Sequence, residues 1–255
     1  MGESQGMTPV SPVKLKGIPD IVICLDVTGS MGPCLEQLKA HLGTFIAELE
    51  APREVQGGAQ VKVSDWRLRL VPYRDLEEPA DVAFPGLIDD FPFCTTTAEF
   101  QSQLSDPRCK ANKGGKEPES ALDAIYSAVR NSPWRPEKEA HRFVILFTDA
   151  TTLPTMHAST TKGGPADVEE VIQAIKTAKI KPILFAPTAP EYAAIYDGVK
   201  ANKTRGGIAE KFPLYGTRED AVAFFKMDTD AARAQFAKVL DDLAATISTE
   251  SSEEL

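Results

Sequence analysis

Three short, almost continuously apolar runs constrain the fold of this chain more than any other feature. They are residues 20–26 (DIVICLD), 141–149 (HRFVILFTD) and 181–187 (KPILFAP). Such a run is typical of a strand that is buried on both faces of a sheet. A predicted helix follows each run, at 34–50, 168–178 and 189–201. Because strands alternate with helices, the sequence predicts an α/β fold with a doubly wound, mostly parallel sheet and helices on both faces.

The remaining segments complete one domain of ordinary size. We expect further strands at 66–73, 80–84 and 221–227, and further helices at 97–104, 118–129 and 229–247. A threonine hydroxyl within 95–97 is expected to cap the helix that begins at 97. Residues 1–17 are expected to form a flexible arm and residues 249–255 an acidic, disordered tail. The domain itself is predicted to span residues 18–248.

Charge and composition narrow the classes of function. The chain has 255 residues, a net charge of −9 and no run of Lys and Arg, which argues against binding to nucleic acids or anionic membranes. No apolar run approaches the roughly 20 residues of a membrane span, and no signal peptide is recognisable, so we expect a cytoplasmic protein. The four cysteines lack CxxC spacing, which favours free thiols over a zinc site or a disulfide framework.

Two of the predicted buried strands end in side chains that carry oxygen. The first strand ends at Asp26, and Thr28 and Ser30 follow at alternate positions; the second run ends in Thr148 and Asp149. In an open parallel sheet, ligands bind in the crevice outside the carboxyl ends of the strands. Carboxylate and hydroxyl oxygens suit Mg²⁺, Mn²⁺ or Ca²⁺ rather than zinc. With few carboxylates among its ligands, such an ion keeps positive charge and attracts an external carboxylate.

These motifs resemble those of the von Willebrand factor A (vWA) domain family. DVTGSM (26–31) resembles the family's metal-ion-dependent adhesion site motif, and FTDA (147–150) resembles its third loop, which supplies an Asp. PYRD (72–75) and GGKEPESALDAIYSAV (114–129) resemble segments of bacterial members, so the similarity covers nearly the whole chain. The resemblance implies a Rossmann-like fold, a bound divalent cation and no enzymatic activity. It also implies a protein partner that offers an Asp or Glu carboxylate, often within a larger assembly.

One position departs from the family pattern. The second loop of the family usually supplies a Thr or Asp ligand, and here that position corresponds to Lys116. Glu117 or Glu119 is then the candidate replacement ligand, although favourable charge in the first turn of a helix explains these two residues equally well. The predicted ligand set is therefore Asp26, Thr28, Ser30, Asp149, Glu117 and Glu119.

Two other functions stay open at this point. An Asp at the end of the first strand is also found in Mg²⁺-dependent phosphatases, although Thr28 stands where those enzymes want a second Asp. Alternatively, the chain is a metal-free docking scaffold in which the ammonium group of Lys116 takes the place of the cation. Ordinary helix capping also accounts for isolated Asp, Ser and Thr residues, but two such groups on two strands favour a site.

Overall fold

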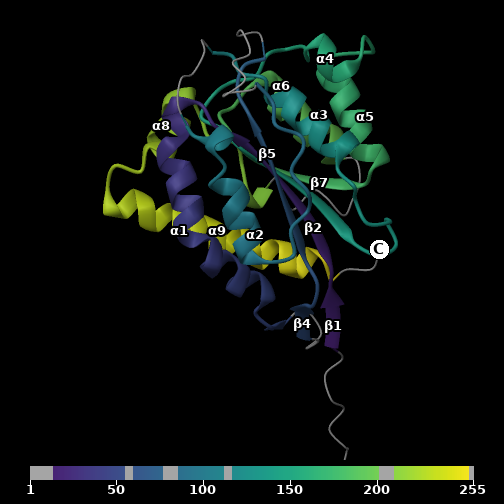
Figure 1. Ribbon diagram of the computed structural model, residues 1–255, viewed down its shortest axis with the longest axis vertical. Coiled ribbons are helices and arrows are strands. Elements are labelled where there is room, and N and C mark those ends of the chain that lie inside the picture. The colour runs from purple at the N-terminus through teal and green to yellow at the C-terminus, as the bar shows by residue number, and fades with distance from the viewer. Residues whose placement is uncertain (1–13, 55–59, 77–85, 112–116, 201–209, 253–255) are drawn as a thin grey trace, which may run out of the picture.

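A four-stranded, all-parallel sheet forms the centre of the protein. The computed structural model describes residues 14–54, 60–76, 86–111, 117–200 and 210–252. The strand order is β5-β2-β6-β7, with bounds Arg67–Tyr73, Pro19–Asp26, His141–Phe147 and Ile180–Phe185. The predicted α/β class and parallel sheet are thus confirmed, and all three apolar runs form adjacent strands (Figure 1).

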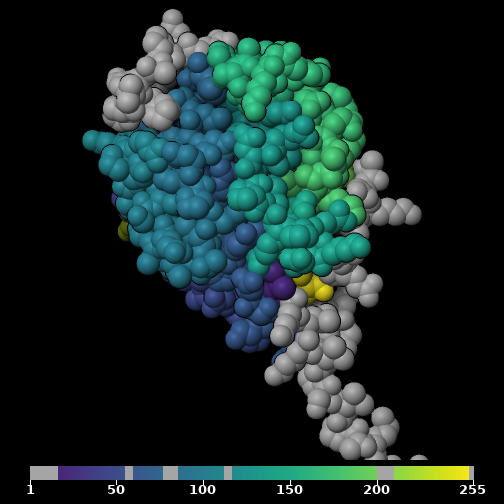
Figure 2. Space-filling model, turned by 45° about the vertical axis from the view of Figure 1, so that its right-hand side comes forward, coloured from purple at the N-terminus to yellow at the C-terminus, as the bar shows by residue number. Residues whose placement is uncertain are grey.

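Helices cover both faces of this sheet because its strands are apolar on both sides. On β2, Ile21, Ile23 and Leu25 face one core, while Val22 and Cys24 face the other. The first core is closed by α1 (Gly32–Glu50), α2 (Thr97–Leu104), α8 (Arg218–Lys226) and α9 (Asp230–Glu250). The second is closed by α3 (Ala121–Asn131), α5 (Val168–Thr177) and α6 (Pro190–Lys200). Figure 2 shows an outer face formed by the teal and green middle of the chain, with almost none of the purple N-terminal segment visible.

A second, smaller sheet lies beyond the amino end of β2. It has the order β1-β4-β3, with bounds Lys14–Gly17, Gln60–Val63 and Arg53–Glu54. The sequence pattern predicts a flexible arm up to residue 17, but the last four residues of that segment pair in parallel with β4. At the other end of the chain, α9 continues through Glu250 and Ser251 is buried, so residues 249–252 are ordered where the pattern predicts a disordered tail.

One predicted strand is wrong. Residues 221–226 belong to α8 rather than to a strand, because a capping box starts a helix just before them, and Met227 is its C-cap. The Thr217 hydroxyl accepts a hydrogen bond from the Asp220 backbone N–H (3.2 Å), and the Asp220 carboxylate accepts one from the Thr217 N–H (2.7 Å). Ala221 and Phe225, four residues apart, are the residues that this helix buries.

The other expected elements agree closely or fall outside the described residues. The helix expected at 97–104 has those bounds, and its cap is Thr96, as predicted. The strand expected at 80–84 lies outside the described residues. The short helix α4 (Ala158–Thr161) and the 3₁₀ turns η1 (Gly29–Met31) and η2 (Pro107–Cys109) complete the fold. Within the described ranges, no helix has the length and apolar character needed to cross a membrane.

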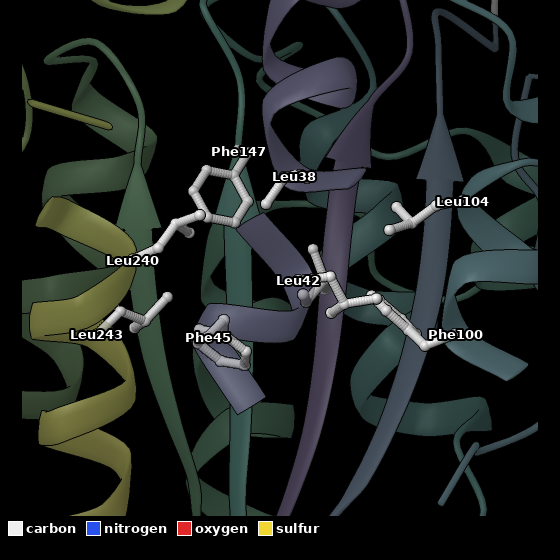
Figure 3. A pocket seen from close by; sticks show the side chains of 9 residues that line it. Leu38, Leu42, Phe45, Phe100, Leu104, Phe147, Leu240 and Leu243 are labelled. Carbon is white, nitrogen blue, oxygen red and sulfur yellow. The ribbon is translucent and has the colours of Figure 1, made fainter. Parts of the chain in front are cut away.

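The first core contains a small apolar cavity (Figure 3). Its volume is about 20 Å³, and side chains from β2, β6, α1, α2 and α9 line it: Ile23, Leu38, Leu42, Phe45, Phe100, Leu104, Phe147, Leu240 and Leu243. A space of this size surrounded only by apolar groups offers no hydrogen bonds to a water molecule, so we treat it as a packing defect.

Candidate metal centre at the carboxyl end of the sheet

The candidate site lies where the chain reverses its direction across the sheet. From β2 the chain crosses to β5 on one side and later returns to β6 on the other. This is the kind of switch point at which open α/β sheets bind ligands. The loops after the strands stay attached to the sheet, because the Val27 N–H donates to the Tyr73 carbonyl and the Thr148 N–H donates to the Phe185 carbonyl, both at 3.0 Å.

Four of the six predicted ligands form one hydrogen-bonded group. The Asp26 carboxylate, fully buried at the end of β2, accepts a hydrogen bond from the Thr28 N–H at 2.9 Å. The Thr28 and Ser30 hydroxyl oxygens lie 3.4 Å apart, and the Ser30 hydroxyl donates to Asp149 Oδ1 at 3.1 Å. The Thr148 hydroxyl donates to Asp26 Oδ2 at 2.8 Å, which connects the two loops a second time.

Burial dominates the electrostatics of the two carboxylates. Loss of hydration raises the pKa of Asp26 to about 6; bonds from Thr28 and Thr148 counteract this rise, and the charge of Asp149 adds to it. Burial also raises the pKa of Asp149, against the hydrogen bond from Ser30 and the positive charge of Arg218. The protein thus holds two carboxylates close together in a region where negative charge is unfavourable.

The two glutamates have contacts of their own, Glu117 with α8 and Glu119 with the loop after β6. Glu117, just before α3, forms an ion pair with Arg218, the first residue of α8. Glu119 is buried, and its main chain bonds to the loop after β6, through the Thr151 carbonyl (3.0 Å) and the Leu153 N–H (2.8 Å). The charge of Glu119 contributes to raising the pKa of Tyr73, the register partner of Asp26, although burial and then the charge of Asp26 raise that pKa more strongly.

Lys116, the residue that departs from the family pattern, lies outside the described residues. Among those that are described, no group of three or more Asp, Glu, His or Cys side chains is arranged to hold a metal ion. An ion at this site would therefore depend on the Thr28 and Ser30 hydroxyls as well as on the carboxylates. The donor set fits a hard cation, because hydroxyl and carboxylate oxygens from two loops already lie within hydrogen-bond distance of one another.

Two residues of the site were not among the predicted ligands. Thr148 was recognised only as the end of a strand, although its hydroxyl holds the Asp26 carboxylate. Arg218 was missed because the sequence pattern places no element directly before a strand at 221–227, far along the chain from the site, whereas α8 begins at Arg218. The T-x-x-D spacing at 217–220 is the signal that indicates a helix beginning at Arg218.

In comparisons with models of known protein families and with curated proteins, nothing matches this chain.

Proposed function

We propose that this chain is a non-enzymatic protein-interaction module of the vWA type, with a doubly wound, Rossmann-like fold. In this proposal it binds Mg²⁺, or Mn²⁺ or Ca²⁺, through Asp26, Thr28, Ser30 and Asp149, and it recognises an Asp or Glu carboxylate of a protein partner. The observation that carries the proposal is the hydrogen-bonded group of these four residues at the switch point of the sheet.

The charges of this group favour binding over catalysis. The Thr28 and Ser30 hydroxyls are neutral ligands, so the charge of a divalent ion is balanced by the two carboxylates at most. Burial raises the pKa of both carboxylates, which makes them harder to ionise without a cation. A bound ion would supply positive charge next to both carboxylates, and it would also attract an anionic ligand from outside. The chain's own task is to hold Thr28 and Ser30 beside Asp149, and the bonds from the Thr148 hydroxyl and the Thr28 N–H to Asp26 achieve this.

A metal-free docking scaffold is the second candidate, and one observation favours it. Arg218 already pairs with Glu117, and its charge lowers the pKa of Asp149 against burial. A basic side chain is thus close to the place where the first candidate requires a cation. In this second function, the guanidinium group of Arg218 would meet the partner's carboxylate directly.

Calorimetric titration with Mn²⁺ and Mg²⁺ tests the first candidate. We expect the wild type to bind one ion and Asp149→Asn to weaken binding by at least about tenfold, because a neutral amide replaces a charged ligand. Asp65→Asn is the matched control, because its carboxylate is mostly exposed and pairs with Arg135 away from the site. Absence of ion binding by the folded wild type, or equal binding by all three proteins, would exclude the metal-dependent function.

A further inference from the structure

We propose that Arg218 is a built-in competitor of the divalent cation, and that it sets the cation affinity of the site. This inference rests on the metal site proposed above and concerns its regulation. In the absence of the ion, the guanidinium group pairs with Glu117 and partly offsets the charge of the buried Asp149. Cation binding has to overcome this charge.

The packing of α8 brings Arg218 close to the site. The helix packs against η1, the turn that carries Ser30, and Arg218 is its first residue. The Arg218 side chain keeps 46% of its surface exposed, and that of its ion-pair partner Glu117 keeps 26%. The pair therefore lies at the boundary between the buried carboxylates and solvent. The charge of Arg218 also reaches Asp149, because it lowers the pKa of that carboxyl against burial, so a divalent cation bound at Asp149 is exposed to the same charge.

The position is electrostatically unusual for an arginine. The first turn of a helix carries partial positive charge and favours acidic residues, as the neighbouring Glu219 and Asp220 illustrate. An arginine at this position gains its stabilisation from charges outside the helix, namely Glu117 and Asp149. Any ion that neutralises Asp149 removes part of this stabilisation, so the ion and the guanidinium group oppose each other's binding.

The expected effect is moderate because the side chain is half exposed. Repulsion between two positive charges falls steeply when water separates them, and exposed ion pairs are worth little. We therefore expect Arg218→Gln to tighten Mn²⁺ binding by about three- to tenfold. Arg218→Lys retains the charge and should bind Mn²⁺ about as the wild type does.

Calorimetry and Mn²⁺ electron paramagnetic resonance on the full chain measure this effect without a partner. Lys226→Gln is the matched control, since Lys226 is on the same helix but is exposed and pairs with Asp228. Tighter binding by Arg218→Gln alone supports the inference. Binding by this variant when the wild type binds no ion also supports it, and in that case it excludes a metal-dependent function of the wild type.

The remaining outcomes separate the two proposals. If wild type and Arg218→Gln bind Mn²⁺ equally, or if the variant binds more weakly, Arg218 is no competitor, and the metal site itself stands. If Arg218→Lys behaves like Arg218→Gln, positive charge is not the cause, and the inference is overturned. If no variant binds Mn²⁺ while circular dichroism shows all of them folded, the metal site fails, and the inference fails with it.

Discussion

Asp20 and Asp26 lie at opposite ends of β2, and their carboxyl groups respond to burial in opposite ways. Neither side chain is exposed to solvent. Burial opposes the charge of Asp20, but hydrogen bonds from Arg67 and Arg135 outweigh it and lower its pKa below the usual value. Within the described ranges, Asp26 receives bonds from neutral groups of Thr28 and Thr148 alone, and its pKa rises to about 6. The nearby cations at Asp20 explain this difference, because they stabilise a buried carboxylate more than neutral donors do.

This contrast predicts a large, pH-dependent cost for Asp20→Asn. The Asp20 carboxylate accepts bonds from Arg67 Nε (2.9 Å), from Arg135 Nε (2.7 Å) and from the Arg135 backbone N–H (2.9 Å). Removing it leaves two cations with a neutral partner, so the free energy of unfolding at pH 7 should fall by about 3–5 kcal/mol. Because the pKa of Asp20 is lower in the folded than in the unfolded protein, its ionised carboxylate stabilises the fold at pH values above its unfolded pKa. This contribution is lost as the pH falls towards the folded pKa.

Urea unfolding of wild type and variant from pH 7 down to pH 3 checks both parts of this prediction. The gap between the two proteins should narrow as the solution becomes acidic. Asp65→Asn, which removes only the exposed partner of Arg135, is the control and should cost less than about 1 kcal/mol. A gap that stays constant with pH would show that the ion pairs of Asp20 do not contribute through its charge.

At the scale of the element, α5 and α6 pack closely because Gly198 of α6, which faces α5, has no side chain. A Cβ added to Gly198 on α6 would lie 2.7 Å from Ile172 Cγ2 on α5. Alanine is the better helix former by about 1 kcal/mol, but the overlap acts against this preference. We expect Gly198→Ala to lower the free energy of unfolding by about 1–3 kcal/mol through overpacking.

A double-mutant cycle with Ile172→Ala, measured by urea unfolding, identifies the cause. The shortened side chain opens the space, so Gly198→Ala should cost less in the Ile172→Ala background than in the wild type. Equal costs in both backgrounds would exclude the contact with Ile172 as the origin of the effect.

The elements with strong periodicity could be predicted from the sequence, and those shaped by distant contacts could not. The apolar runs of β2, β6 and β7 and the stripes of the long helices are local signals, so the sheet was predicted almost completely. The strand β1 carries no such signal, because it forms only through its pairing with β4, more than forty residues later. In α8, the segment AVAFFKM combines aromatic and β-branched residues that favour a strand, and the capping box overrides them.

The candidate site shows the same division between local and distant signals. Asp26, Thr28, Ser30 and Asp149 follow strands that the sequence reveals, so their meeting at one end of the sheet follows from parallel topology. Arg218 reaches Glu117 from a helix about a hundred residues away, and no local pattern carries that information.

At the scale of the whole molecule, one aromatic cluster joins the core to the site. Phe147, fully buried, stacks on Phe185 with ring centroids 4.8 Å apart and contacts Phe236 at 6.1 Å. It also borders the small cavity, and the next two residues along the chain are Thr148 and Asp149. The packing of this ring thus supports the loop that carries a predicted ligand.

Phe147→Ala should therefore be among the most damaging core substitutions. It enlarges an existing cavity, and the free energy of unfolding should fall by about 3–5 kcal/mol in urea titrations. Phe224→Ala is the control, because Phe224 belongs to the same aromatic cluster but is only partly buried and should cost less. Similar losses for both variants would contradict the central role of Phe147.

The small sheet and the end of α9 meet at the pole opposite the site, where a Cβ added to Gly17 would lie only 2.4 Å from Ser251 Oγ (Figure 1). The two ends of the described fold thus leave the domain side by side, facing away from Asp26 and Asp149. A biotin tag joined beyond either end would fix the molecule to a sensor chip in one orientation. The candidate site would then face the flowing solution, where an analyte can reach it without crossing the linker.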